Sequence, residues 1–188
     1  THPLVHPDAA APAGWNPAFP EAVRSVVLPG YSVFDADDAV TATGRLLADG
    51  SVRAKLPSGV GGVGQQVLHS VDELRALIGQ WPATALRDDG LVLERNLHEV
   101  VTYSVGQVRV GPWLITYCGT QQLTHNHAGL AVYGGSRLTI VRGDHGCLLQ
   151  QPLDQSQQRA VMQAMVYHDQ ALACFPGLVA SRRNYDVV

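Results

Sequence analysis

The 188-residue sequence predicts an α+β fold, because helical and strand patterns occur in blocks and do not alternate along the chain. Capping residues followed by apolar residues at helical spacing indicate helices. Short apolar runs separated by turn residues indicate strands that pair with their neighbours in an antiparallel sheet. The resulting order is helix, hairpin, helix, a mostly antiparallel sheet, then helix and strand.

The first half opens with a proline-rich stretch. Five of the eleven prolines lie within residues 1–20, so we expect residues 1–29 to be a linker or an extended arm. Asp35 then opens a helix that runs through Leu47, with an acidic first turn. Val52–Lys55 and Gln65–His69 read as two strands of an antiparallel hairpin with a long connecting loop.

A capping box, Ser70-Val71-Asp72-Glu73, opens the next helix, which we expect to end near Gln80. A buried strand, Leu91–Leu93, follows and becomes polar at Glu94. The remaining predictions are a hairpin that turns at Gly106-Gln107, strands over 113–120 and 138–142, a helix from Asp154 to about Phe175, and a final strand over 179–188.

Composition excludes several classes of protein. The formal charge of −3 argues against nucleic-acid binding, which needs a basic face. No apolar run approaches the roughly 18 residues of a membrane span, and the start does not resemble a signal peptide. The three cysteines Cys118, Cys147 and Cys174 form no Cys-x-x-Cys pair, which favours a reduced, cytoplasmic setting. The oligomeric state stays open.

Lys55 is the single lysine against twelve arginines, and it ends a short strand just before a glycine-rich loop. Lysine is a compact point charge, so it is not interchangeable with arginine at a phosphate. Glycine N–H groups can approach an anion without a Cβ in the way. The order strand, lysine, glycine-rich loop therefore suggests a site for a polyphosphate. It is neither a Walker P-loop nor a Rossmann turn.

The stretch from Gly30 to Leu97 resembles the nucleotide-binding lobes of the ATP-grasp superfamily, as in an uncharacterised bacterial branch of it. Lys55 matches that family's strand lysine, residues 58–64 its flexible loop, and Leu91–Leu97 its adenine hinge. The resemblance implies that ATP contacts Lys55, Ser58, Gly59, Gly61, Gly62, Gly64, Glu94, Arg95, Asn96, Leu97 and Glu99. Glu94 would lie near the adenine amino group and Glu99 near the ribose hydroxyls.

The same resemblance implies two small α+β lobes, residues 30–97 and a truncated lobe over 98–188. It implies ATP with Mg²⁺, Asp186 as a metal ligand, and ligation of a small-molecule carboxylate to an amine or thiol through an acylphosphate. Two features depart from the family: Asn184 stands where an arginine is common, and no Glu-x-Asn strand follows by Val188. Because the chain begins at Thr1 without an initiator methionine, we expect a fragment of a longer protein. The resemblance implies that this fragment lacks an amino-terminal lobe and the last metal-binding strand.

Two other functions remain open. His125-Asn126-His127 places two histidines on one face of an extended segment, and with a carboxylate such as Glu99 it could form a non-haem Fe(II) oxygenase site. The segment also reads as a polar loop, which is a poor platform for a metal. The third alternative is a non-catalytic binding module that keeps the ATP-grasp fold. The carboxylate donor and the nucleophile cannot be read from the sequence.

Overall fold

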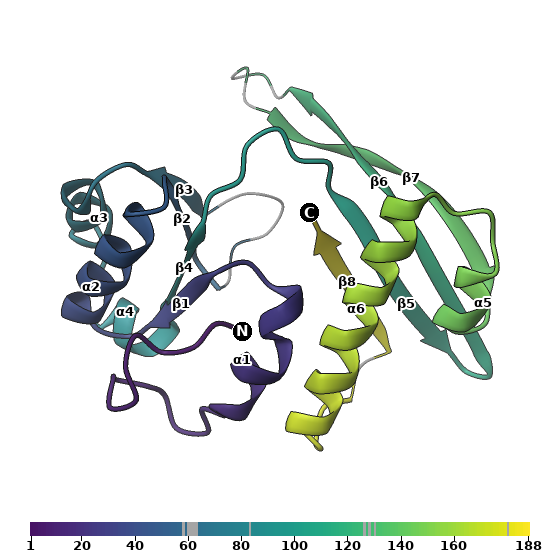
Figure 1. Ribbon diagram of the computed structural model, residues 1–188, viewed down its shortest axis with the longest axis horizontal. Coiled ribbons are helices and arrows are strands. Elements are labelled where there is room, and N and C mark those ends of the chain that lie inside the picture. Colours follow the sequence, from purple (N-terminus) through teal and green to yellow (C-terminus); the bar gives the residue numbers. More distant parts are fainter. Residues whose placement is uncertain are drawn as a thin grey trace. The chain divides into compact units, whose positions relative to one another are not determined.

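The computed structural model describes residues 1–57, 59, 64–82, 84–125, 127, 129, 131–179 and 181–188. It divides into two compact units, Thr1–His98 and Glu99–Val188. Each unit has one four-stranded antiparallel sheet with helices packed against it (Figure 1). The α+β class and the mainly antiparallel sheets are therefore confirmed. Within the described residues, no helix has the length and apolar character needed to cross a membrane.

The first unit contains a sheet with strand order β1-β4-β2-β3, in which all neighbours are antiparallel. Its strands are β1 (Gly30–Val33), β2 (Val52–Lys55), β3 (Gln65–Leu68) and β4 (Leu91–Arg95). Its helices are α1 (Ala18–Val23), the 3-10 turn η1 (Arg24–Val26), α2 (Ala36–Leu47), α3 (Val71–Ile78) and α4 (Ala85–Asp89).

Helices α2 and α3 start where their capping residues predict. The Asp35 carboxylate accepts the backbone N–H of Asp37 at 2.8 Å, and Ser70 Oγ accepts that of Glu73 at 3.2 Å. Such side-chain acceptors satisfy N–H groups that a helix leaves open at its start. Both helices pack on one face of the sheet, where Leu74 from α3 joins Leu93 from β4 in the buried core.

Residues 1–29 are folded, and the expected linker or extended arm is wrong. Val5 is 5% exposed and belongs to the core beneath α2, and Phe19 and Val23 of α1 are also buried. The segment Thr1–His6, which we call the N-terminal strap, runs along the outer edge of β1, because Pro3 O accepts the backbone N–H of Ser32 at 2.9 Å. Prolines leave few N–H groups to satisfy, so burial of apolar side chains can hold an irregular chain in place.

The second unit contains a sheet with strand order β7-β6-β5-β8. Its strands are β5 (Tyr103–Val110), β6 (Trp113–His125), β7 (Ala131–Arg142) and β8 (Arg182–Val187), and its helices are α5 (His145–Leu149) and α6 (Gln155–Cys174). Asp154, where the sequence predicts that this helix begins, forms a reciprocal capping box with Gln157 at the start of α6. Val161 of α6 packs with Val105 and Cys118 of the sheet.

The predicted hairpin turn at Gly106-Gln107 is wrong, because β5 continues through both residues. The chain turns instead at Gly111 and Pro112, between β5 and β6. Gly111 has φ +55°, which a tight two-residue hairpin turn requires at its first central position. Gly106 is a glycine because it pairs with Tyr117 on β6, and a Cβ there would overlap the tyrosine ring.

Candidate functional site

Strand alternation places the polar side chains of the first sheet on one face. Val52 and Ala54 of β2 point into the core beneath the helices, so Arg53 and Lys55 point to the opposite face. Glu94 of β4 pairs with Arg53 across the sheet and therefore shares that face. We call the surface formed by Arg53, Lys55, Glu94 and Asn96 the polar face.

A buried carboxylate lies at the centre of the polar face. The Glu94 side chain is 8% exposed, and its two oxygens contact different partners: Oε1 pairs with Lys55 Nζ, and Oε2 lies 3.2 Å from His2 Nε2. Burial alone would raise the pKa of Glu94, but the hydrogen bonds from His2 and Lys55 and the lysine charge outweigh it. The pKa of Glu94 therefore lies below its ordinary value. The Lys55 side chain stays 35% exposed.

Arg53 and Asn96 extend the same face. The Arg53 guanidinium donates to Asn96 Oδ1 through Nε at 3.1 Å and Nη2 at 2.7 Å, and it reaches Gln65 at 3.1 Å. The amide nitrogen of Asn96 donates to Ser51 Oγ at 3.1 Å. These bonds hold a second cation two residues along β2 from Lys55, with its planar group already oriented.

The other residues for which the resemblance to an adenine hinge implies ATP contacts are Arg95, Leu97 and Glu99, and they do not all lie on the polar face. Arg95 pairs with Asp49 at 2.8 Å, on the face of β4 opposite Glu94. Leu97 is half-buried, whereas Glu99 is exposed and has φ +51°, an uncommon backbone conformation for a glutamate. The structure therefore brings Lys55, Glu94 and Asn96 together, and it does not place Arg95 beside them.

The glycine-rich loop is described only at its ends. Leu56 N donates to Gly64 O at 2.9 Å, which closes the base of the loop, and Gly59 N donates to Leu56 O at 3.0 Å. The N–H group of Gly59 is therefore already bonded within the loop. Ser58, Gly61 and Gly62, which the resemblance also implies as ATP contacts, lie outside the described residues.

Asp186, the expected metal ligand, lies on the face of the second sheet opposite α6. Its Oδ1 accepts hydrogen bonds from Gln121 Nε2 at 2.7 Å and Asn184 Nδ2 at 2.9 Å, with Ser104 Oγ at 3.5 Å. Tyr117 in turn donates to Asn184 Oδ1 at 3.0 Å. The three donors converge on one oxygen of this exposed carboxylate.

The histidine pair does not gather further ligands in the part of the chain that is described. His125 ends β6 opposite Ala131, where the sequence predicts a loop, and both His125 and His127 are exposed. No group of three or more His, Cys, Asp or Glu side chains among the described residues is arranged to hold a metal ion. Glu99 therefore completes no such group with the two histidines.

Sequence reasoning missed His2, Arg53 and Gln121. Arg53 could have been found, because it stands two residues before Lys55 in the same strand and must share its face. His2 carried no signal, since it precedes Glu94 by 92 positions in a stretch interpreted as a linker. Gln121 likewise reaches Asp186 only through the pairing of β6, β5 and β8.

Comparison with solved structures supports the fold. The D-alanyl-alanine synthetase A of Vibrio cholerae matches with a TM-score of 0.51 at 13% identity, over 88% of this chain and 47% of that one. Two further matches are weaker. The carboxyaminoimidazole ribonucleotide synthase of Aspergillus clavatus, complexed with ATP, matches with a TM-score of 0.48 at 15% identity, over 81% and 36%. The D-alanine–D-alanine ligase of Bacillus anthracis matches with a TM-score of 0.42 at 14% identity, over 90% and 51%.

The fold and the match to the D-alanyl-alanine synthetase define an α+β protein with an ATP-grasp-like fold. The chain spans about half the length, or less, of the solved structures that it matches. The model of one protein family, described as "Protein of unknown function (DUF3182)", matches residues 1–188, and the chain belongs to that family. No protein of curated function matches the sequence.

Proposed function

We propose that this chain is the nucleotide-binding part of an ATP-dependent ligase that joins a carboxylate to an amine or a thiol. The observation that carries the proposal is the single lysine, Lys55, paired with the buried Glu94 on the polar face of the first sheet. The ATP-grasp-like fold supports the proposal, since the solved structure that matches with a TM-score of 0.51 is a D-alanyl-alanine synthetase.

The polar face fits a bound nucleotide. Lys55 lies at the end of a strand, and its side chain, which carries the ammonium group, is about a third exposed, which suits contact with a phosphate oxygen. Arg53 lies on the same face with its guanidinium held by Asn96. Glu94 lies in β4, which would line the adenine base, and Asn96 directly follows that strand, so β4 and its neighbour β2 could recognise adenine and phosphate together.

Asp186 fits a magnesium ion at the second sheet. Mg²⁺ takes oxygen ligands, and it is usually held by one or two carboxylates together with substrate phosphates. The amides of Gln121 and Asn184 fix Asp186 through Oδ1, so Oδ2 can face a cation without disturbing the sheet. Bound ATP would transfer its γ-phosphoryl group to a substrate carboxylate, which leaves ADP and an acylphosphate. An amine or thiol would then attack the acyl carbon and release phosphate.

The work of the protein's own residues in this chemistry is positioning and charge neutralisation. Lys55 would neutralise phosphate charge, Glu94 would hold Lys55 on the polar face until a nucleotide binds, and Asn96 would fix Arg53 as a second cation. None of these groups needs to give or take a proton.

The test compares two ligands. Lys55→Ala should weaken ATP binding by about 1.5–3 kcal/mol, the scale of a charged hydrogen bond, and leave adenosine binding nearly unchanged. Arg24→Ala is a matched control, because Arg24 is an exposed cation of the same unit and pairs only with the exposed Glu21 in the described structure. Titration calorimetry measures the affinity of both variants, and of the parent protein, for ATP and for adenosine. Equal losses for ATP and adenosine, or no loss for ATP, would remove Lys55 from this role.

A further inference from the structure

The Glu94 carboxylate contacts both Lys55, to which the proposed function gives a role, and His2, to which it gives none. Lys55 takes Oε1 and His2 takes Oε2, at 3.2 Å from Nε2. The Glu94–His2 contact is buried, since the Glu94 side chain is 8% exposed and the His2 side chain is 4% exposed. Removing one partner of a buried ion pair is costly because it leaves a charge without compensation.

Resting on the proposed function, we propose that His2 is a positioning residue, which keeps Glu94 paired while Lys55 turns from the carboxylate to the phosphate of a bound nucleotide. The Lys55 ammonium has three N–H donors, and a donor directed at Glu94 is not available to a phosphate. With His2 in place, the carboxylate keeps one charge-assisted hydrogen bond when the ammonium moves. Without His2, the same movement of Lys55 would leave the buried Glu94 carboxylate without a partner. ATP would then bind more weakly.

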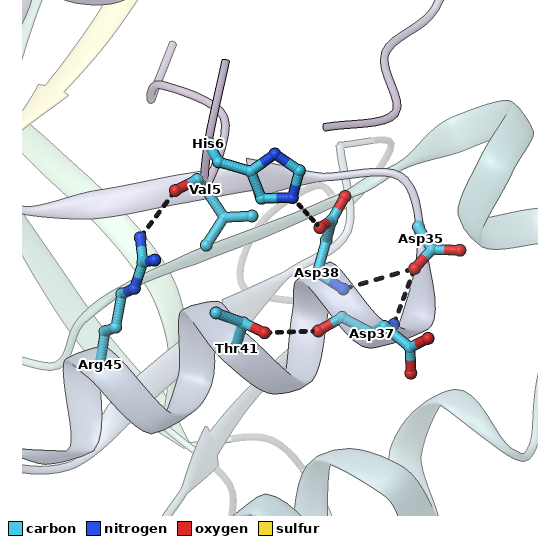
Figure 2. A network of polar contacts seen from close by, with 7 residues as sticks. All are labelled: Val5, His6, Asp35, Asp37, Asp38, Thr41 and Arg45. Carbon is cyan, nitrogen blue, oxygen red and sulfur yellow. Dashed lines mark hydrogen bonds and ion pairs between the residues drawn. The ribbon is translucent and has the colours of Figure 1, made fainter. Parts of the chain in front are cut away.

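The strap that carries His2 is anchored independently of Glu94. Val5 O accepts a hydrogen bond from Arg45 Nη1 at 2.6 Å, and His6 Nε2 lies 3.0 Å from Asp38 Oδ1, both on α2 (Figure 2). Asp38 follows the capping Asp35 in the first turn of α2, so this anchor belongs to a well-defined helix start. Pro3 O is bonded to Ser32 N, and Val5 is buried in the core.

These anchors all follow His2 in the chain and begin at the next residue, Pro3, so the imidazole is presented to Glu94 from a fixed backbone. The Nδ1 atom of His2 is buried without a hydrogen-bond partner among the described residues. Burying an unpartnered nitrogen costs free energy. The bond through Nε2 is therefore the polar contact that accounts for this histidine's position.

The first experiment measures ATP and adenosine affinity in His2→Ala, His2→Gln and Lys55→Ala, and in the His2→Ala/Lys55→Ala double variant. We expect His2→Ala to weaken ATP about tenfold and adenosine less than about twofold, on the scale of one charged hydrogen bond. His2→Gln should retain most of the affinity, because its amide can donate from nearly the same position. In the Lys55→Ala background, His2→Ala should cause no further loss.

The second experiment needs no nucleotide. Because Lys55 is the single lysine, acylation by an amine reagent, read by mass spectrometry on the peptide that contains residue 55, reports on this one ammonium group. In His2→Ala, Glu94 should hold Lys55 more tightly, and the acylation rate should fall several-fold. In His2→Gln, and in the exposed control His69→Ala, the rate should match that of the unaltered protein.

The outcomes separate the two proposals. If Lys55→Ala weakens ATP but His2→Ala leaves both ATP affinity and Lys55 acylation unchanged, the positioning role is overturned and the proposed function stands. Equal losses of ATP and adenosine in His2→Ala also overturn it, since they indicate a general structural effect. If Lys55→Ala leaves ATP affinity unchanged, the proposed function itself fails, and the role of His2 in nucleotide binding fails with it.

Discussion

Tyr117 of β6 lies across Gly106 of β5, its cross-strand partner. A Cβ built on Gly106 would overlap the hydroxyl oxygen and Cζ of Tyr117 and lie 2.6 Å from the backbone oxygen of Arg183. The tyrosine hydroxyl then reaches Asn184 on β8, at 3.0 Å from Oδ1. One glycine thus lets an aromatic ring cross a strand and connect to the strand that carries Asp186.

Gly106→Ala should therefore destabilise the second unit by about 1–3 kcal/mol, the usual cost of overpacking. Gly44→Ala is the matched control: Gly44 lies exposed within α2, a Cβ there meets nothing within 4 Å, and alanine should stabilise the helix by roughly 0.5–1 kcal/mol. Urea unfolding of the two variants checks the opposite signs. If the Gly106→Ala protein were as stable as the parent protein, the position of the Tyr117 ring would not depend on the absence of a Cβ at residue 106.

Gly106 also shows where sequence reasoning fails. A glycine between apolar runs is typical of a turn, and only the pairing with Tyr117 identifies it as a point of close approach. By contrast, α2 and α6 were predictable because Asp35 and Asp154 cap them through contacts within a few residues. His2 was not predictable, since its contact with Glu94 depends on tertiary packing that no local pattern encodes.

Glu94 should make the first unit sensitive to acid. Because its pKa is lower in the folded protein than in the unfolded chain, its stabilising effect is complete above the ordinary glutamate pKa of about 4.3 and is lost as the pH falls through the folded value. Glu94→Gln should cost about 1–3 kcal/mol at pH 7, because Lys55 loses its partner. It should also flatten the loss of stability below about pH 4.3. Urea unfolding between pH 7 and pH 3 measures both effects.

Glu21→Gln is the control for this experiment. Glu21 pairs with Arg24 at 2.6 Å, but both side chains are more than half exposed, so the pair should contribute little. Its stability should stay within about 0.5 kcal/mol of the parent protein. A Glu94→Gln protein with the parent's acid profile would show that the carboxylate is not the group that titrates.

His168 of α6 should give the second unit a separate sensitivity at higher pH. Its Nδ1 lies 3.0 Å from the hydroxyl of Tyr185, and Arg183 of β8 contacts its ring. Burial lowers the pKa of His168, and the Arg183 charge lowers it further; the charge of Asp169 opposes the shift, and that of His145 adds to it. A histidine that is harder to protonate when folded stabilises fully above its ordinary pKa of about 6.5, and this contribution is lost as the pH falls.

Hydrogen exchange in peptides of α6 should therefore accelerate between about pH 6.5 and pH 5, after correction for the intrinsic rate. His168→Gln should reduce this change, because the uncharged amide cannot be protonated beside Arg183. His145, whose pKa is also lowered by burial, should account for part of the remainder. The exposed His125→Gln is the control and should keep the parent profile. An unchanged slope in His168→Gln would assign the titration to another group.

Asp186 offers the most direct test of a metal at the second sheet. Asp186→Asn keeps an oxygen at the position that accepts Gln121 and Asn184, so the strand network should persist while the negative charge is lost. We expect ATP affinity in the presence of Mg²⁺ to fall roughly tenfold, towards the affinity that the parent protein shows in EDTA, on the scale of one charged contact. Adenosine affinity and thermal stability should stay unchanged. The exposed Asp169→Asn removes the same charge from α6 and should leave the effect of Mg²⁺ intact. If Asp186→Asn retained the full dependence on Mg²⁺, the ion would have to be held elsewhere, and Asp186 would be a structural acceptor for β5 and β6.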